Sequence, residues 1–380
     1  MDAARFKRSK GQIRIAKEGY PYFVPPPIPR ELEYDSSIVD LLARAQLQLG
    51  RLSSFGDLIP NPQLLIAPYL RREAVLSSRI EGTQASIRDV FKNEAKLEHP
   101  ADVADMREVR NYVTASEKGV QAIAARPLDL DLLRELHGIL LHTVRGSDRH
   151  PGQFRRIQNW IGPPGCTAQS ALFVPPEPGI MKERLADLDA FLIGPPQIPD
   201  VLQAALLHYQ FEAIHPFEDG NGRIGRLLVM LLLIKRRTLS APLLYLSAYF
   251  EANRQDYYKA LLRVSTEGAY DDWFRFFLEG VATQAADAFT RAKRLIHLRE
   301  SYRKKLQGMH ATVSTLIILD QLFVNPFTSI TGAADRLGVV YPTAQKAIEE
   351  YLVPAEILME VTRQKRYRVW VAREILTTLE

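Results

Sequence analysis

Apolar residues recur at helical spacing along most of this chain, with polar residues between them. The pattern predicts helices over about 36–49, 61–81, 86–98, 102–124, 129–143, 178–193, 199–214, 222–236, 254–266 and 270–307. Gly82 follows the second of these helices and suits the left-handed conformation that often ends a helix. No apolar run approaches the ~18 residues that a membrane span requires. The pattern therefore predicts a mainly α-helical protein with no membrane span.

The helical pattern is interrupted at two places. In 150–178, two short strand-like runs at 154–161 and 171–175 flank a cluster of glycines and prolines, which predicts a β-hairpin with a long loop. Residues 1–20 are basic and are expected to form a flexible arm. The proline-rich segment 20–30 that follows is expected to be extended.

The last part of the chain has a different order of elements. Three helices and a hairpin are predicted at 311–324, 328–337, 341–352 and 359–370. This is the order of a winged helix-turn-helix domain. The helix in the recognition position carries Glu349 and Glu350 against Lys346, which does not favour DNA binding. The basic residues lie in the hairpin instead: Arg363, Lys365, Arg366 and Arg368. A partner-binding or dimerising module is the favoured interpretation, with DNA binding as the alternative.

Composition narrows the class of protein without identifying it. The 380 residues are 46% hydrophobic and 24% charged, as in ordinary globular proteins with two to three domains. We place the domains at 1–110, 111–290 and 291–380. A net charge of +5 from 49 cations and 44 anions is too balanced to indicate a nucleic-acid-binding protein as a whole. The single cysteine, Cys166, excludes an intrachain disulfide and a cysteine-rich zinc site. We therefore expect a cytoplasmic protein.

The segment 214–226, with the sequence IHPFEDGNGRIGR, is the richest in chemistry. His215 precedes a proline, so the helix before it should end there, and its imidazole can serve as a general base. Gly220 and Gly222 permit positive φ angles and a close approach to the backbone. Because an apolar helix follows, its free N–H groups should converge at these glycines and bind an anion.

Three charged residues extend this predicted anion site. Arg223 and Arg226 are three residues apart in the first helical turn, so both guanidinium groups can reach one polyphosphate. Asp219 is a hard oxygen ligand placed for Mg²⁺ beside the glycines. Each feature alone is common in structural roles, but their occurrence within one loop and helix indicates a catalytic phosphate site.

This segment resembles the signature HPFx[D/E]GNGRxxR of the Fic (Fido) family at every defined position. The resemblance implies a helical core with a β-hairpin flap that transfers AMP from ATP to a Ser, Thr or Tyr hydroxyl of a protein, including the enzyme itself. It implies that His215 is the catalytic base and that Asp219 holds Mg²⁺ at the phosphates. The implied ATP-binding residues are Gly220, Asn221, Gly222, Arg223, Ile224, Gly225 and Arg226, with Arg226 at the γ-phosphate.

The resemblance extends beyond the signature. The predicted hairpin at 154–175 lies where the family has its flap, which aligns a target segment by strand addition. The stretch 253–258 is similar to the family's adenine-binding stretch, which implies that Asn253 bonds the base or ribose and that Tyr257 stacks on it. The alternative is that Asn253 caps a helix and the tyrosine belongs to the core. His208 is expected to be a packing residue.

A second motif lies at the end of the predicted helix 61–82. Ser77 and Glu81 are four residues apart on one helix face, and Glu81 is in the last turn, where the helix dipole disfavours an anion by about 0.3–1 kcal/mol. The segment resembles [S/T]xxxE[G/N], the inhibitory motif of Fic proteins. The resemblance implies that Glu81 pairs with Arg226 and occupies the place of the γ-phosphate.

Three functions are compatible with these observations. The favoured one is an autoinhibited protein adenylyltransferase whose partners are ATP and proteins with accessible hydroxyls. The second is a DNA-binding regulator with a nucleotide-sensing core. The third keeps the site but removes AMP from proteins or transfers another nucleotide group. A homodimer is compatible with the exposed helical faces.

Overall fold

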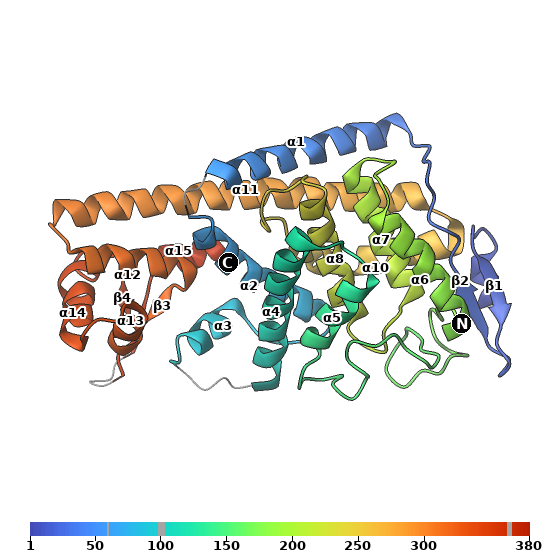
Figure 1. The fold of residues 1–380 in the computed structure, drawn as a ribbon, viewed down its shortest axis with the longest axis horizontal. Coiled ribbons are helices and arrows are strands. Elements are labelled where there is room, and N and C mark those ends of the chain that lie inside the picture. The colour runs from blue at the N-terminus through green and yellow to red at the C-terminus, as the bar shows by residue number, and fades with distance from the viewer. Residues whose placement is uncertain (59–60, 98–102, 363–366) are drawn as a thin grey trace.

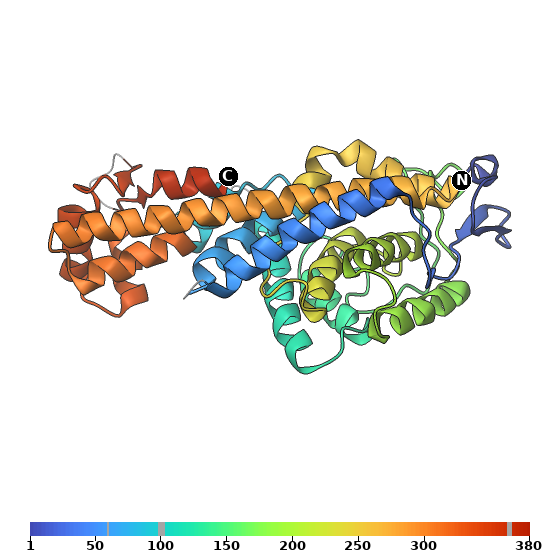
Figure 2. The ribbon, with the colours of Figure 1, turned by 90° about the horizontal axis from the view of Figure 1, so that it is seen from above.

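The computed structural model describes residues 1–58, 61–97, 103–362 and 367–380, and these are mainly helical, as predicted. Two long helices, α1 (Ser36–Leu58) and α11 (Tyr270–Gly308), lie side by side along the molecule (Figures 1 and 2). Beneath them lie the other helices of the core, and α2 and α8 among them carry the two motifs. These helices are α2 (Gln63–Ile80), α3 (Ile87–Glu94), α4 (Val103–Ala125), α5 (Leu130–Leu140), α6 (Pro178–Ile193), α7 (Asp200–Ile214), α8 (Asn221–Lys235), α9 (Ser247–Ala252) and α10 (Arg254–Glu267).

Helix α8 is the centre of this core. Its sequence, RIGRLLVMLLLI after the two initial residues, is apolar on all faces, and its residues from Ile224 to Leu233 are buried. A helix that is apolar all round is stable only when other helices surround it. Helices α4, α5 and α7 pack on it, and the end of α2 lies against its first turns. The two arginines of the signature are therefore carried into the interior by the same helix.

The N-terminal segment is ordered, which corrects the prediction of a flexible arm over 1–20. It forms a 3-10 helix, η1 (Ala3–Phe6), and an antiparallel hairpin of β1 (Gln12–Ile15) and β2 (Pro21–Val24). The rings of Phe6 and Phe173 are each packed on Phe23, with ring centroids 5.4 and 5.7 Å away. Burial of these aromatic side chains outweighs the basic character of the segment.

The predicted hairpin at 154–175 is also wrong in its extent. Its two runs form no strands and meet at one antiparallel bridge, between Ile161 and Phe173. The intervening prolines lack the N–H group that a strand ladder requires, and the chain turns at Pro163, whose carbonyl accepts the N–H of Cys166 at 3.1 Å. The segment is therefore a long loop pinned at its base.

The C-terminal part follows the predicted order of elements. It consists of α12 (Val313–Val324), β3 (Phe327–Thr328), α13 (Ile330–Leu337), α14 (Tyr341–Lys346), the π-helical η2 (Ala347–Leu352), β4 (Met359–Glu360), β5 (Trp370–Val371) and α15 (Arg373–Leu379). The three strands form an antiparallel sheet in the order β3-β5-β4. Helices α15 and α9 were not predicted, since both are short.

This C-terminal part lies at one end of α11 and contacts the core through α2 (Figure 1). Three of the four basic hairpin residues (Arg363, Lys365 and Arg366) lie outside the described residues. Arg368 pairs with Glu349 and, at 2.7 Å, with Glu360, so its charge is satisfied within the chain. Helix α11 runs unbroken through residue 291, and the division into domains stays a prediction. Within the described ranges, no helix is both long enough and apolar enough to cross a membrane.

Candidate active site

The loop between α7 and α8 has the backbone that the signature requires. Helix α7 ends at Ile214, and His215 follows in the left-handed conformation at φ 50° and ψ 61°. This conformation is uncommon for a residue with a side chain and needs support from its surroundings. Gly220, at φ 77°, immediately precedes α8. The loop thus turns sharply twice and brings the imidazole back to the start of α8.

Arg155 provides the support at the first turn, a role that no motif in the sequence indicates. Its side chain is 1% exposed, and its Nε donates to the His215 carbonyl at 2.9 Å. Its backbone N–H donates to the Pro216 carbonyl at 2.9 Å, and its other nitrogens bond the carbonyls of Ile157 and Pro176. Burial lowers the pKa of Arg155 to about 10. A buried cation therefore holds the histidine turn through carbonyl groups.

The imidazole of His215 is neutral at physiological pH. Burial, and secondly the positive charge of Arg155, lower the pKa of His215 to about 4. Its Nδ1 lies 3.4 Å from the Glu212 carbonyl oxygen. A neutral imidazole that donates from Nδ1 keeps the lone pair on Nε2. The geometry therefore leaves Nε2 able to accept a proton.

The side chain of Asn221 closes the loop, and its implied contact with ATP stays a prediction. It is buried, and its amide bonds the backbone of Phe217 twice: Oδ1 accepts from the N–H at 2.9 Å and Nδ2 donates to the carbonyl at 2.8 Å. The N–H groups in the first turn of α8 have no acceptor within the helix, so they are available to bind an anion.

Two other residues assigned to ATP binding face away from this turn. Ile224 is fully buried in the core. Gly225 faces α7, because a Cβ there would lie 2.5 Å from Glu212 Oε1 and 3.3 Å from the ring of His208. Their side-chain positions serve the packing of α8 on α7, and contact with a nucleotide through these positions is not supported.

Asp219 is held by a buried histidine that sequence analysis missed. His137 Nδ1 accepts the Gly152 N–H at 2.9 Å, so the ring proton is on Nε2, which donates to the Asp219 carbonyl at 2.9 Å. The ring stacks on Phe217 with centroids 3.8 Å apart. Burial lowers the pKa of His137 to about 4, which keeps this tautomer neutral. The backbone of Asp219 is thus held in place by the His137 side chain.

A metal at this loop would have one protein carboxylate. No group of three or more His, Cys, Asp or Glu side chains arranged for a metal occurs in the part of the chain that the structure describes. Asp219 is 36% exposed, and its Oδ2 faces Gly146, where a Cβ would lie 2.7 Å away. One accessible hard oxygen beside an anion site fits Mg²⁺, which commonly takes its other ligands from substrate phosphates and water.

Arg223 and Arg226 are both buried, but their partners differ. Arg223 Nη1 donates to Glu108 Oε2 at 3.2 Å, and its Nη2 lies 3.5 Å from Asp219 Oδ1. Its Nε and Nη2 have no hydrogen-bond acceptor among the described residues. Arg226 is bonded to the end of α2 through two of its nitrogens: Nε donates to Ser77 Oγ at 2.9 Å and Nη2 donates to the Ser77 carbonyl at 2.9 Å.

The structure also brings Glu81 to Arg226, as the second motif implies. Glu81 Oε1 accepts from Arg226 Nη2 at 2.8 Å. A Cβ at Gly222 would lie 2.3 Å from the same oxygen, so the carboxylate lies directly against the glycine of the anion site. Burial would raise the pKa of Glu81, but the charge and hydrogen bond of Arg226 outweigh it and lower that pKa. In turn the pKa of Arg226 is raised.

The predicted adenine-binding residues are less accessible than expected. Tyr257 is 1% exposed, its hydroxyl pairs with His208 Nε2 at 2.8 Å, and its ring stacks on Phe250 with centroids 4.5 Å apart. Stacking of Tyr257 on a base does not fit this burial. The neighbouring Tyr258 is 45% exposed. Asn253 is half-buried between α9 and α10 and donates to the Tyr249 carbonyl at 2.9 Å.

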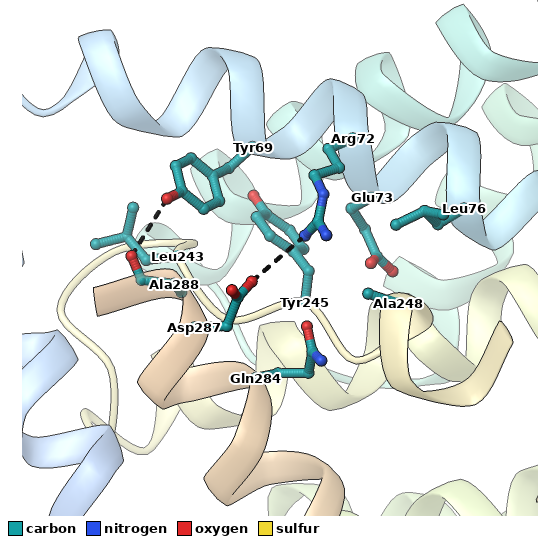
Figure 3. Close-up of a pocket in the computed structure, with 10 residues that line it drawn as sticks. All are labelled: Tyr69, Arg72, Glu73, Leu76, Leu243, Tyr245, Ala248, Gln284, Asp287 and Ala288. Carbon is teal, nitrogen blue, oxygen red and sulfur yellow. Dashed lines mark hydrogen bonds and ion pairs between the residues drawn. The ribbon is translucent and has the colours of Figure 1, made fainter. Parts of the chain in front are cut away.

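Buried acids behind the site were also missed. Glu73, on α2, bonds the Ser247 hydroxyl at 2.5 Å and the Tyr112 hydroxyl at 3.2 Å, and burial raises its pKa. Glu212, on α7, has its pKa raised to about 8 by burial. Figure 3 shows a small cavity beside Glu73, where Arg72 points toward Asp287. It has room for about one water molecule and belongs to the packing of α2.

Comparison with known proteins identifies the family to which these motifs correspond. A model of the Fic/DOC family N-terminal region matches residues 39–121, and the Fic/DOC family model matches residues 127–233. A probable protein adenylyltransferase of Aquifex aeolicus is 34% identical over 99 residues, which are 26% of this chain and 28% of that protein. The protein adenylyltransferase Fic of Aedes aegypti is 33% identical over 131 residues, 34% of this chain and 23% of its own length. The chain thus spans about a quarter of these relatives.

Solved structures extend the similarity in fold to most of the chain. A Fic family protein from Desulfovibrio desulfuricans has a TM-score of 0.58 at 20% identity, over 91% of this chain and 98% of that one. Fic-1 from C. elegans, residues 134–508, has a TM-score of 0.52 at 19% identity, over 69% of this chain and 74% of that one. At these identities the similarity concerns the fold alone.

Proposed function

Because the chain belongs to the Fic/DOC family, we propose that it is an autoinhibited protein adenylyltransferase that moves AMP from ATP to a Ser, Thr or Tyr hydroxyl of a protein. The observation that carries this proposal is the contact of Glu81 with both Arg226 and the Gly222 backbone, beside a neutral His215. An acid in an anion site is the arrangement expected where an anionic substrate competes with an internal inhibitor.

In the proposed reaction, His215 Nε2 accepts the proton of the target hydroxyl as its oxygen attacks the α-phosphorus of ATP. The new bond joins that oxygen to phosphorus, the bond from the α-phosphorus to the bridging oxygen breaks, and diphosphate leaves. The N–H groups at the start of α8, with Arg223 and Arg226, stabilise the negative charge on the phosphates. Mg²⁺, when bound at Asp219, would offset the charge of the departing diphosphate.

The proposed inhibition follows from the competition for Arg226. While Glu81 holds this guanidinium, the γ-phosphate cannot take its place beside Gly222. ATP then binds with its outer phosphates displaced, and the α-phosphorus is not presented in line to the hydroxyl. Ser77 contributes by fixing the Arg226 side chain at the end of α2. The inhibition therefore acts on phosphate alignment more than on nucleotide affinity.

Three finer points belong to this proposal. Mg²⁺ is the proposed cofactor on the strength of the Asp219 carboxylate. A cytoplasmic location is supported by the scarcity of cysteine. The C-terminal part is proposed to bind a protein or a second copy of the chain, because the described basic residue of its hairpin, Arg368, is already paired.

The test is incubation of the full chain with ATP and Mg²⁺, followed by intact-mass spectrometry. A mass gain of one AMP group on the Glu81→Gly variant, absent from the same variant with His215→Ala, is the expected result. A parallel incubation with an AMP-modified protein tests the reverse reaction. Loss of AMP from that protein, without transfer from ATP, would replace the proposal with AMP removal, for which Glu81 would orient water.

A further inference from the structure

Glu108, in the second turn of α4, is the only partner that fixes Arg223 through a hydrogen bond among the described residues. Both side chains are buried: Arg223 is 0% and Glu108 is 4% exposed. Glu108 Oε2 also accepts from the Thr83 hydroxyl at 3.3 Å, and its Oε1 lies 3.6 Å from Arg145 Nε. The carboxylate is therefore held on three sides before any ligand enters.

The bonding of Arg223 is incomplete in a specific way. Glu108 takes Nη1, while Nε and Nη2 have no hydrogen-bond acceptor although both are buried. Burying two guanidinium N–H donors without hydrogen bonds is costly, so their presence in the interior calls for an explanation such as a bound ligand. Nη2 is directed to the Asp219 side, 3.5 Å from Oδ1, where the anion site lies. A phosphate bound beside Asp219 would accept hydrogen bonds from these two nitrogens, Nε and Nη2.

We propose that Glu108 is the positioning residue that orients Arg223 toward the β-phosphate of the bound nucleotide. This inference rests on the proposed function and names a residue outside both motifs. Glu108 balances the charge of Arg223 in the interior and fixes one edge of its guanidinium group. The opposite edge is then presented to the phosphate without further rotation, which reduces the ordering cost of binding.

Arg145 links this pair to the inhibitory helix. Its Nε faces Glu108, and its Nη2 donates to the Glu81 carbonyl at 3.2 Å. Arg145 is 54% exposed and lies at the mouth of the site, so it is a weaker constraint than the buried Glu108. A test of Glu108 in a chain that keeps Glu81 must therefore use nucleotides that do not compete with Glu81. ADP and AMP meet this requirement, since neither has a γ-phosphate.

The experiment is calorimetric binding of ADP and AMP, each with Mg²⁺, to the full chain. The wild type is expected to bind ADP more tightly than AMP. Glu108→Gln is expected to weaken ADP binding by about tenfold or more, with AMP binding changed less than about twofold, since AMP has no β-phosphate. Glu117→Gln is the matched control, because Glu117 is exposed on the same helix and undergoes the same chemical change.

The outcomes separate the inference from the function on which it rests. A wild type that binds neither nucleotide overturns the proposed function. A Glu108→Gln variant that keeps the wild-type preference for ADP, or loses ADP and AMP affinity equally, overturns the positioning role alone. Because removing one partner of a buried ion pair can unfold a protein, Glu108→Asp is measured in parallel. It retains the charge, and the expected result is an ADP-specific loss smaller than that of the glutamine variant.

Discussion

Helix α8 presents two arginines, one turn apart, to two acids from different helices, and the two pairs differ in almost every respect. Glu108 lies in the second turn of α4, is 4% exposed and leaves Nε and Nη2 of Arg223 without a hydrogen bond among the described residues. Glu81 lies at the end of α2, is 30% exposed and, together with Ser77, occupies the nitrogens of Arg226 that face α2. The same pair of residue types can therefore prepare a cation for a ligand or keep the ligand from it.

The two contacts differ because Glu108 lies within a helix and Glu81 lies at the end of one. Glu108 is buried within α4 and is bonded to Arg223 and Thr83, so it cannot leave without disrupting the helix packing, and its contact is a permanent part of the site. A residue at a helix end, where the dipole disfavours its charge, is stabilised mainly by the cation that it contacts. If a phosphate replaces the carboxylate as the anion that the cation binds, the helix end can move. We infer that position along the helix separates a structural contact from an inhibitory one.

The largest effect on AMP transfer is expected for His215, which belongs to neither of the two pairs formed by Glu81 and Glu108. His215→Ala should lower AMP transfer by about 10²–10⁴-fold, because the hydroxyl loses its base. ADP affinity should stay unchanged, since both arginine pairs remain. Transfer kinetics in the Glu81→Gly background, together with ADP calorimetry, test this. Loss of ADP binding would show that the imidazole belongs to the phosphate site.

The next largest effect is expected for the shared arginine. Arg226→Ala should lower transfer by about 10²–10³-fold whether Glu81 is present or replaced by glycine, because a phosphate ligand is lost in both cases. Rates for the single and double variants at saturating ATP check this. An active double variant would mean that Arg226 serves the inhibitory contact alone.

Glu81 and Glu108 can be compared directly by replacing each with glutamine. Glu81→Gln should raise transfer by about tenfold, because a neutral amide binds the guanidinium more weakly. Glu108→Gln, placed in the Glu81→Gly background, should lower transfer by about tenfold at limiting ATP. Initial rates over a range of ATP concentrations measure both. Changes of the same sign would abolish the distinction between the two pairs.

Stability at acidic pH tests His137, which supports the loop without contacting either arginine pair. The pKa of His137 is about 4 in the folded protein against 6.5 for the free side chain, so the unfolded chain binds more protons between these values. Stability should therefore fall as pH decreases from 6.5 to about 4, by up to about 1.4 kcal/mol per pH unit for this residue. His137→Gln keeps an acceptor and a donor and should show a shallower fall. Urea unfolding at several pH values measures the slopes, and identical slopes would contradict the assignment.

The motifs were predictable because their residues are close in sequence. His215 to Arg226 lie on one loop and the helix after it, and Ser77 and Glu81 share one helix face. The contact between Glu81 and Arg226 was expected only through the resemblance to a family. Glu81 and Arg226 are 145 positions apart, and the sequence pattern alone does not indicate that their helices meet.

The supporting residues could not be predicted for the same reason. His137, Arg155 and Glu108 act through atoms of residues that lie 82, 60 and 115 positions away. Each occupies an unremarkable place in a helix or loop pattern. Two wrong predictions also have physical causes: aromatic burial orders residues 1–20, and prolines break the expected hairpin. The role of Tyr257 in adenine binding stays a prediction, although its hydroxyl is bonded in the core.

The proposed inhibition requires that Glu81 holds Arg226 and thereby blocks the γ-phosphate position. Its most direct test is incorporation of labelled AMP by wild type and Glu81→Gly side by side, at equal protein and ATP concentrations with Mg²⁺. The account predicts clearly greater labelling of Glu81→Gly, with nucleotide affinity changed much less than rate. Equal labelling of the two proteins would contradict it, and Glu81 would then be a carboxylate that only anchors the end of α2.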